Sequence, residues 1–302
     1  MAAKLTLGPV LFNWAPEKWR DFYFRIADEA PVDSVCVGEV VCSKRAPFFD
    51  AVLPEVVERL EAAGKELLHS TLALVMNEDE MKRVRAVAAE PELFVEANDI
   101  SAVALLAGRP HAIGPFVNVY NEGTLAYLGR LGATRVSLPA ELPAESLAVL
   151  AKSAAVELEV QVFGRLPLAV SARCYHARSR SLHKDGCQYV CGEDPDGMEI
   201  KTLDGKPFLA VNGTQTLSYT CCNLVRELEA LGAMGIGRFR LSPQDVDMVA
   251  VARIFREALD GGEEPLAAFH RLGDLANGMP FSNGFYYGTE GADLIVPLAE
   301  AL

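Results

Sequence analysis

The alternation of strand and helix signals limits the fold of this chain more than any other feature of its sequence. Of seven short apolar runs, the first six are each followed by an amphipathic segment of helical spacing, one of them covering residues 48–63. Such alternation is the pattern of a parallel sheet covered by helices. The seven predicted strands lie at residues 5–11, 34–41, 66–75, 93–96, 111–120, 134–138 and 157–163.

The alternation breaks after the seventh strand and then returns. Residues 198–217 predict a hairpin that turns at Asp204-Gly205, and residues 222–231 predict a helix. Residues 237–241 and 245–259 predict an eighth strand and an eighth helix.

Eight units predict an α/β fold of the (β/α)8 TIM-like barrel type, with a cysteine-rich insertion after strand seven. The predicted barrel is a single domain over residues 1–302, and the insertion covers residues 164–222. A doubly wound open sheet is the alternative.

Three cysteines, Cys174, Cys187 and Cys191, lie in the predicted insertion. The last two are four residues apart, so on a helical turn their sulfur atoms would share one face. Arg, His and Lys surround them in the sequence, a setting expected to lower thiol pKa values. Clustered thiols without a recognisable secretion signal predict metal ligands rather than disulfides.

A fourth thiol is expected from Cys42, which follows the second predicted strand. In a barrel the loops that follow the strands lie at one end, and strands two and seven are separated only by strands eight and one. The barrel would therefore bring Cys42 to the three cysteines of the insertion. Four thiolates suit zinc or an iron–sulfur cluster, and the irregular spacing favours a [4Fe–4S] cluster.

The net charge of −13 argues against a nucleic-acid partner, because basic surfaces supply most of that affinity. No apolar run is long enough for a membrane span. The first residues lack the order of a signal peptide, and seven cysteines fit poorly with complete disulfide pairing. The expected compartment is the cytoplasm.

Several segments resemble the collagenase-like ("unknown mechanism") peptidase family, and the resemblance covers nearly the whole chain. They are LGPVLFNW (7–14), VCVGEVVCSKR (35–45), GPFVNVYN (114–121), GRLPLAVSARC (164–174) and the Cys-x12-Cys-x3-Cys stretch. The positions of Cys42, Cys174, Cys187 and Cys191 match cluster-binding cysteines of the family branch that acts in ubiquinone biosynthesis. The C-terminal loop lacks the Cys and His of many relatives.

The resemblance implies an iron–sulfur protein that forms one subunit of an oxygen-independent hydroxylase. Its partners would be a UbiU-like sister protein in a heterodimer and UbiT, a sterol-carrier-like lipid-binding accessory protein. Its substrate would be an aromatic polyprenyl quinone precursor. A peptidase-like or RNA-modifying relative with a structural cluster, and a zinc-stapled binding subunit, are the alternatives.

Four polar residues near predicted strands each have a functional and a structural interpretation. Glu39 is an active-site carboxylate or a locally paired charge. His69 faces the barrel mouth or, as the favoured interpretation, is a satisfied core histidine. Asn118 and Asn121 line the mouth or cap the next helix.

Four more residues adjoin the candidate ligands. Arg173 and Lys44 could tune a cluster through charge and hydrogen bonds, or simply be solvated. His176 and His183 are substitute ligands that four cysteines make unnecessary.

The other three cysteines have structural interpretations. Cys36 alternates with valines in a predicted strand and is expected to pack in the core. The adjacent pair Cys221-Cys222 is expected at a helix entrance. No Ser-His-Asp or His-Glu-x-x-His signature supports a conventional protease.

Overall fold

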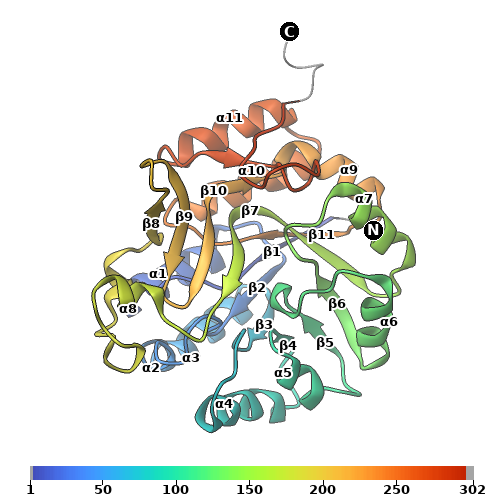
Figure 1. Cartoon of the computed structure of the whole chain (residues 1–302). Coiled ribbons are helices and arrows are strands. Elements are labelled where there is room, and N and C mark those ends of the chain that lie inside the picture. Colours follow the sequence, from blue (N-terminus) through green and yellow to red (C-terminus); the bar gives the residue numbers. More distant parts are fainter. Residues whose placement is uncertain (1–2, 297–302) are drawn as a thin grey trace.

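A closed barrel of eight parallel strands forms the centre of the molecule, as seen in the computed structural model, which describes residues 3–296 (Figure 1). The barrel closes because β11 pairs with both β1 and β7, in parallel. This confirms the predicted (β/α)8 fold and corrects the open-sheet alternative. The barrel strands are β1 (Lys4–Leu7), β2 (Ser34–Val37), β3 (Glu66–Ser70), β4 (Val95–Ala97), β5 (His111–Ile113), β6 (Ala133–Ser137), β7 (Glu157–Val170) and β11 (Arg238–Leu241).

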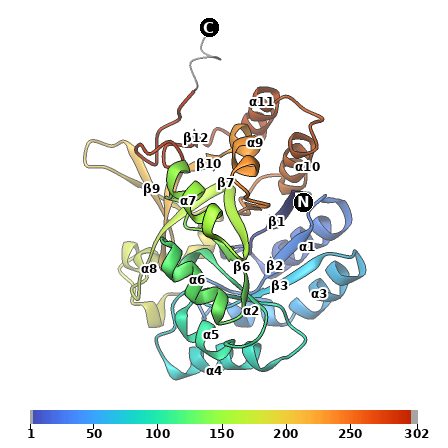
Figure 2. The same ribbon diagram turned by 90° about the vertical axis from the view of Figure 1, so that its right-hand side faces the viewer.

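Helices surround the barrel and bury their apolar faces against the outer faces of its strands (Figure 2). Five of them begin at side-chain caps, where Asn77, Asp99, Asn121, Cys174 and Asp247 accept backbone hydrogen bonds. The helices are α1 (Pro16–Glu29), α2 (Ala46–Asp50), α3 (Leu53–Ala62), α4 (Glu78–Ala89), α5 (Ile100–Leu105), α6 (Glu122–Arg130), α7 (Ala144–Ser153), α8 (Tyr175–Ser179), α9 (Leu228–Ala233), α10 (Met248–Leu259) and α11 (Pro265–Leu275).

The predicted insertion extends one side of the barrel into an antiparallel sheet. The strand β7 continues past the barrel, and β10 (Gln215–Asn223), β9 (Pro207–Asn212) and β8 (Met198–Lys201) add to it in that order. The predicted turn at Asp204-Gly205 is confirmed, with Gly205 at a φ of 83°. The short strand β12 (Phe281–Ser282) also pairs with β10.

Several predicted strands extend too far at their carboxyl ends. The strand predicted at 34–41 ends at Val37 because Gly38 adopts a φ of 117°. The strand predicted at 111–120 ends at Ile113 and is followed by the 3₁₀ turn η1 (Pro115–Val117). Apolar residues continue into the loops, so the sequence alone did not show where pairing stops.

Two predicted helices were wrong in part. The helix predicted at 48–63 is two helices, α2 and α3, and Pro54 in the first turn of α3 lacks the backbone donor that a continuous helix needs. The helix predicted at 222–231 begins only at Leu228. Cys221 and Cys222 lie in β10 and not at a helix entrance.

The inner and outer faces of the barrel strands differ in chemistry. Along β1 and β2, outward Leu5 and Val35 pack in the main hydrophobic core beneath the helices. The residues that alternate with them, Thr6, Ser34 and Cys36, point into the barrel. Of residues 3–296, no helix is long and apolar enough to cross a membrane.

Candidate functional site

Four cysteines from two distant loops line one small cavity beside the barrel. They are the four predicted ligands, Cys42, Cys174, Cys187 and Cys191. The closure of the barrel between β7 and β2 brings them together, as the sequence predicted. Within residues 3–296, no three His, Cys, Asp or Glu side chains close on a common point suited to a single metal ion.

The loop that carries Cys42 is held by the carboxylate of Glu39. Its Oε1 accepts backbone hydrogen bonds from Val41 at 2.7 Å and from Cys42 at 2.8 Å. Burial raises the pKa of Glu39. The structure therefore assigns Glu39 the local pairing that the sequence left open, and this pairing orients Cys42.

The other three cysteines lie on separate short elements of the insertion. Cys174 caps α8, and its Sγ accepts from the backbone N–H of Ala177 at 3.4 Å. Cys187 follows the 3₁₀ turn η2 (Lys184–Gly186), and Cys191 lies in η3 (Val190–Glu193). Left-handed residues separate the two turns, with Tyr189 at a φ of 53°. Cys187 and Cys191 therefore lie at two separate turns and not on one helical turn.

Side chains and backbone groups fasten the insertion to the loops after β1 and β2. Trp14 Nε1 donates to the carbonyl oxygen of Pro195 at 2.7 Å. Thr214 Oγ1 donates to the carbonyl oxygen of Val41 at 3.0 Å. The rings of Phe48 and Tyr189 meet edge to face, with centroids 4.7 Å apart. The two halves of the cavity are therefore held in register by contacts other than their thiols.

Arg45 is the most unusual side chain at this cavity. It is only 1% exposed, and no carboxylate of residues 3–296 lies within ion-pair distance of it. Its terminal nitrogens donate to the carbonyl oxygen of Leu11 and to Asn212 Oδ1, both at 2.8 Å. Its Nε has no hydrogen-bond partner. A buried guanidinium beside four thiols is a counterion for negative charge in the cavity.

The glycine that follows β9 makes room for this guanidinium. A Cβ on Gly213 would lie 2.5 Å from a terminal nitrogen of Arg45, and Gly213 has a φ of 65°. Burial lowers the pKa of Arg45, but nearby Glu39, Cys191 and Cys42 raise it above its ordinary value overall. No pattern in the sequence indicates that Arg45, rather than its neighbours, faces the thiols.

The expectation of lowered thiol pKa values was wrong for Cys42 and Cys174. Burial raises the pKa of Cys42 and of Cys174, and the nearby cations only reduce this effect. Arg173 is exposed and does not line the cavity, and Arg180 pairs with Glu193. The cations of this loop therefore largely face solvent.

The remaining predicted neighbours have structural contacts. Lys44 and Lys184 line the cavity, and Lys44 Nζ donates to the carbonyl oxygen of Lys184 at 2.7 Å. His176 is buried away from the cavity, with Nε2 2.8 Å from Asp194 Oδ2. His183 also lies outside the cavity lining.

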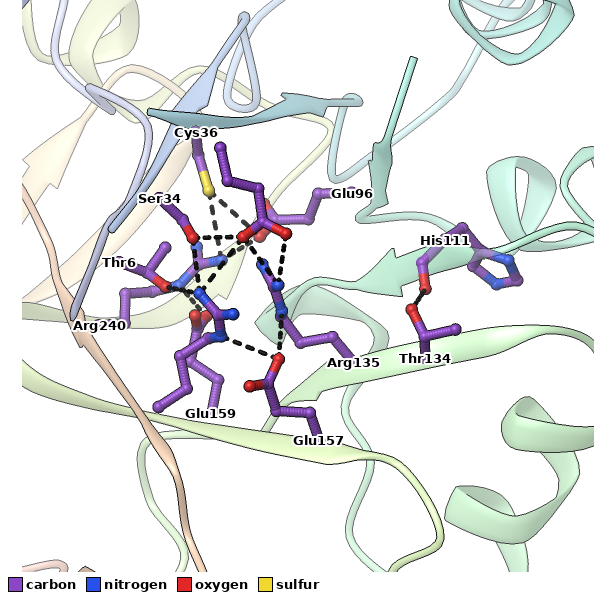
Figure 3. Close-up of polar contacts among 12 residues, drawn as sticks. Thr6, Ser34, Cys36, Glu96, His111, Thr134, Arg135, Glu157, Glu159 and Arg240 are labelled. Carbon is purple, nitrogen blue, oxygen red and sulfur yellow. Dashed lines mark hydrogen bonds and ion pairs between the residues drawn. The ribbon is translucent and has the colours of Figure 1, made fainter. Parts of the chain in front are cut away.

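The barrel interior is filled by a network of charged side chains (Figure 3). Near its centre, Arg240 Nε donates to Glu159 Oε1 at 2.6 Å, and its terminal nitrogen donates to Glu96. Glu96 also accepts from Ser70 at 3.0 Å and from Asn98 at 3.1 Å. Barrel enzymes place their reacting groups at this depth of the barrel. Here, however, the charged side chains are paired with other side chains of the protein.

A second layer of the network lies nearer the amino ends of the strands. Arg135 donates to Glu157 at 3.0 Å and to both oxygens of Glu66. Arg238 donates to Glu157 at 2.9 Å and to Ser34 at 2.6 Å. The sequence analysis did not identify these residues, although polar side chains at every second strand position were a usable signal.

The remaining residues singled out in the sequence lie in or just after the barrel strands. Cys36 is buried as expected, inside the barrel, with Sγ 3.7 Å from Glu96. His69 points outward, toward a pocket beneath the helices, so neither the mouth nor a satisfied core position describes it. Asn121 caps α6, whereas Asn118 ends η1 in a left-handed conformation.

The fold and the four-thiol cavity define a (β/α)8-barrel protein with a candidate cofactor site at the rim. The model of peptidase family U32 matches residues 19–295, and the chain belongs to this family. This confirms the family-level resemblance found in the sequence.

Comparison with individual proteins adds one curated relative and two solved structures. The tRNA hydroxylation protein P2 of Bacillus subtilis (strain 168) is 29% identical over 147 residues, which are 46% of this chain and 48% of that protein. The match therefore spans about half the length of the relative.

The structural similarities are weak. Phospho-2-dehydro-3-deoxyheptonate aldolase from Thermotoga maritima has a TM-score of 0.42 and 11% identity, covering 93% of this chain and 72% of that chain. Tryptophan synthase from M. tuberculosis has a TM-score of 0.34 and 12% identity, covering 89% and 94%. These scores are too low to add to the topology described above.

Proposed function

We propose that this chain is an iron–sulfur subunit of an oxygen-independent hydroxylase. Cys42, Cys174, Cys187 and Cys191 would hold a [4Fe–4S] cluster. The observation that carries the proposal is the convergence of these four thiols, from two loops, on one cavity with a buried arginine.

The residues present fit such a group. Four thiols are the usual donor set of a [4Fe–4S] cluster, and all four line the same cavity. Arg45 would offset part of the negative charge of four thiolates, and its free Nε supplies a further donor. When bound, the cluster would supply one-electron chemistry.

The substrate assignment rests on the sequence resemblance to UbiV of ubiquinone biosynthesis. In that assignment, the chain pairs with a UbiU-like sister protein and acts on an aromatic polyprenyl quinone precursor, with UbiT as the lipid-binding accessory. The hydroxylation named for the Bacillus subtilis relative supports the same reaction type.

Iron and acid-labile sulfide, measured on protein purified without oxygen, test the cofactor. We expect about four irons and four sulfides per chain, and loss of both in Cys174→Ala. Cys221→Ala is the matched control, because Cys221 is buried in β10 away from the cavity, and it should keep its iron. Zinc, or no metal, in the unaltered protein would contradict the cluster and favour the zinc-stapled binding subunit.

RNA hydroxylation is the second candidate, favoured by the name of the Bacillus subtilis relative. The net charge of −13 speaks against direct binding of tRNA by this chain alone. A deletion strain grown without oxygen separates the two. Loss of ubiquinone with unchanged hydroxylated tRNA nucleosides is expected, and the reverse result would replace the quinone assignment.

A further inference from the structure

A second cavity lies on the other side of the loop that carries Cys42. Its volume is about 120 Å³, and it is bounded by the carboxyl ends of β2 and β3 and by helices α1 to α4. Small-molecule sites are usually concave and largely apolar. The apolar part of its lining includes Trp19, Phe49, Leu53, Leu72, Val84 and Val87.

The rings in this pocket favour a flat aromatic ligand. Trp19 and Phe49 are tilted by 31° to each other, with centroids 5.3 Å apart. Aromatic pairs prefer offset or edge-to-face contacts, so a third ring can pack against such a pair. Valine and leucine side chains complete the lining and suit an alkyl substituent.

His69 supplies a free polar group in this apolar surrounding. Its ring makes no hydrogen bond within residues 3–296 and lines the pocket. Burial lowers its pKa, so at neutral pH it is an uncharged imidazole with one donor and one acceptor. Other polar groups at the pocket have partners: Ser43 donates to Glu80 at 2.8 Å, and Arg83 pairs with Asp50.

One loop forms the wall between this pocket and the thiol cavity. Gly38, Glu39, Ser43 and Ala46 line the pocket, whereas Cys42, Lys44 and Arg45 line the thiol cavity. The loop turns tightly against β3, since a Cβ on Gly38 would lie 2.7 Å from the carbonyl oxygen of Ser70. A ligand in the pocket would therefore lie one loop away from the candidate cofactor.

We propose that this pocket binds an alkyl-substituted phenol, with the ring against Trp19 and Phe49 and the hydroxyl group hydrogen-bonded to His69. The proposal rests on the function proposed above only for the role of this ligand as the compound to be hydroxylated. The pocket itself requires no cluster.

Titration with 4-hexylphenol and with hexylbenzene, followed by calorimetry, tests the pocket. We expect saturable binding of 4-hexylphenol and a loss of about fivefold in affinity in His69→Leu, with hexylbenzene little affected, because only the phenol can hydrogen-bond to the imidazole. Equal effects on both compounds would overturn the assigned role of His69.

Val87→Trp should fill the pocket and weaken 4-hexylphenol binding by about tenfold or more. Val57→Trp is the matched control, since Val57 is also a half-buried helical valine but does not line the pocket. Absence of saturable binding, or equal binding by both variants, would overturn the proposal.

Repeating the titration with Cys174→Ala separates this proposal from the proposed function. We expect Cys174→Ala to bind 4-hexylphenol, because none of the four candidate ligand cysteines lines the pocket. Phenol binding by an unaltered protein that contains no iron would retain the pocket and reject the cluster. Four irons without phenol binding would retain the cluster and reject the pocket.

Discussion

Two buried arginines in this protein have opposite surroundings. Arg240, in the barrel interior, lies between Glu96 and Glu159, with ion pairs to both. Arg45, at the thiol cavity, donates to the oxygens of Leu11 and Asn212 and interacts with the Cys191 thiol, and its Nε has no hydrogen-bond partner. The charged side chains of the barrel interior therefore pair with one another. Arg45 has no carboxylate of residues 3–296 within ion-pair distance, so its positive charge favours a negative group in the thiol cavity.

This difference distinguishes a structural charge network from a candidate site. Buried charges without partners are costly, so they persist where something compensates them. In the barrel the compensation comes from other strands. At the cavity it would come from thiolates and the group that they hold.

Arg240→Met should have the largest effect on stability. It leaves two buried carboxylates without their partner, at a cost of about 3–5 kcal/mol in the free energy of unfolding. Arg271→Met is the surface control, because the half-exposed Arg271 pairs at the helix surface, and should cost under about 1 kcal/mol. Denaturant unfolding measures both, and equal costs would show that the interior network is not structural.

Arg45→Met should have an intermediate effect that depends on the cofactor. In the metal-free Cys174→Ala protein it removes two hydrogen bonds, at about 1–3 kcal/mol. In the unaltered protein it should also speed the loss of iron to a chelator, and Arg45→Lys should restore part of the retention by restoring the charge. Unchanged iron retention in Arg45→Met would contradict the counterion role.

Acid should weaken the barrel network. Burial opposes ionisation of Glu66, but Ser34, Arg135 and Arg238 hold its pKa below the ordinary value. A depressed pKa stabilises the folded state above the unfolded pKa, and this is lost as the pH falls below about 4.3. Because Glu66 is 43% exposed, Glu66→Gln should remove under about 1 kcal/mol of this pH dependence in denaturant unfolding. If the free energy of unfolding falls more steeply with acid in Glu66→Gln than in the unaltered protein, the prediction is contradicted.

Lys44→Ala should have the smallest effect, although Lys44 lies closer to Cys42 in sequence than Arg45 does. Its carboxylate partner Asp185 is 98% exposed, so the pair contributes little. Stability should change by under about 0.5 kcal/mol, and iron content should stay the same. Iron loss matching that of Arg45→Met would show that charge near the cavity matters regardless of burial.

Much of the fold could be predicted because its signal is periodic. The alternation of apolar runs and amphipathic segments identified all eight barrel strands, and the closure of the barrel then predicted that Cys42 would meet the insertion. The periodic pattern of apolar residues is a weaker guide to secondary structure at the ends of short apolar runs. Cys221 and Cys222 were placed at a helix entrance for this reason, since a short apolar segment fits a strand as well as a helix.

The sequence by itself determined the eight strand-and-helix units and the four-cysteine set, because spacing along the chain records both. Only the tertiary structure decided which cation faces the thiols and which way His69 points. Arg45 is selected over Arg173 by contacts with Leu11 and Asn212, which are 34 and 167 residues away along the chain. Such contacts exist only after the barrel has closed, so local sequence cannot encode them in a readable pattern.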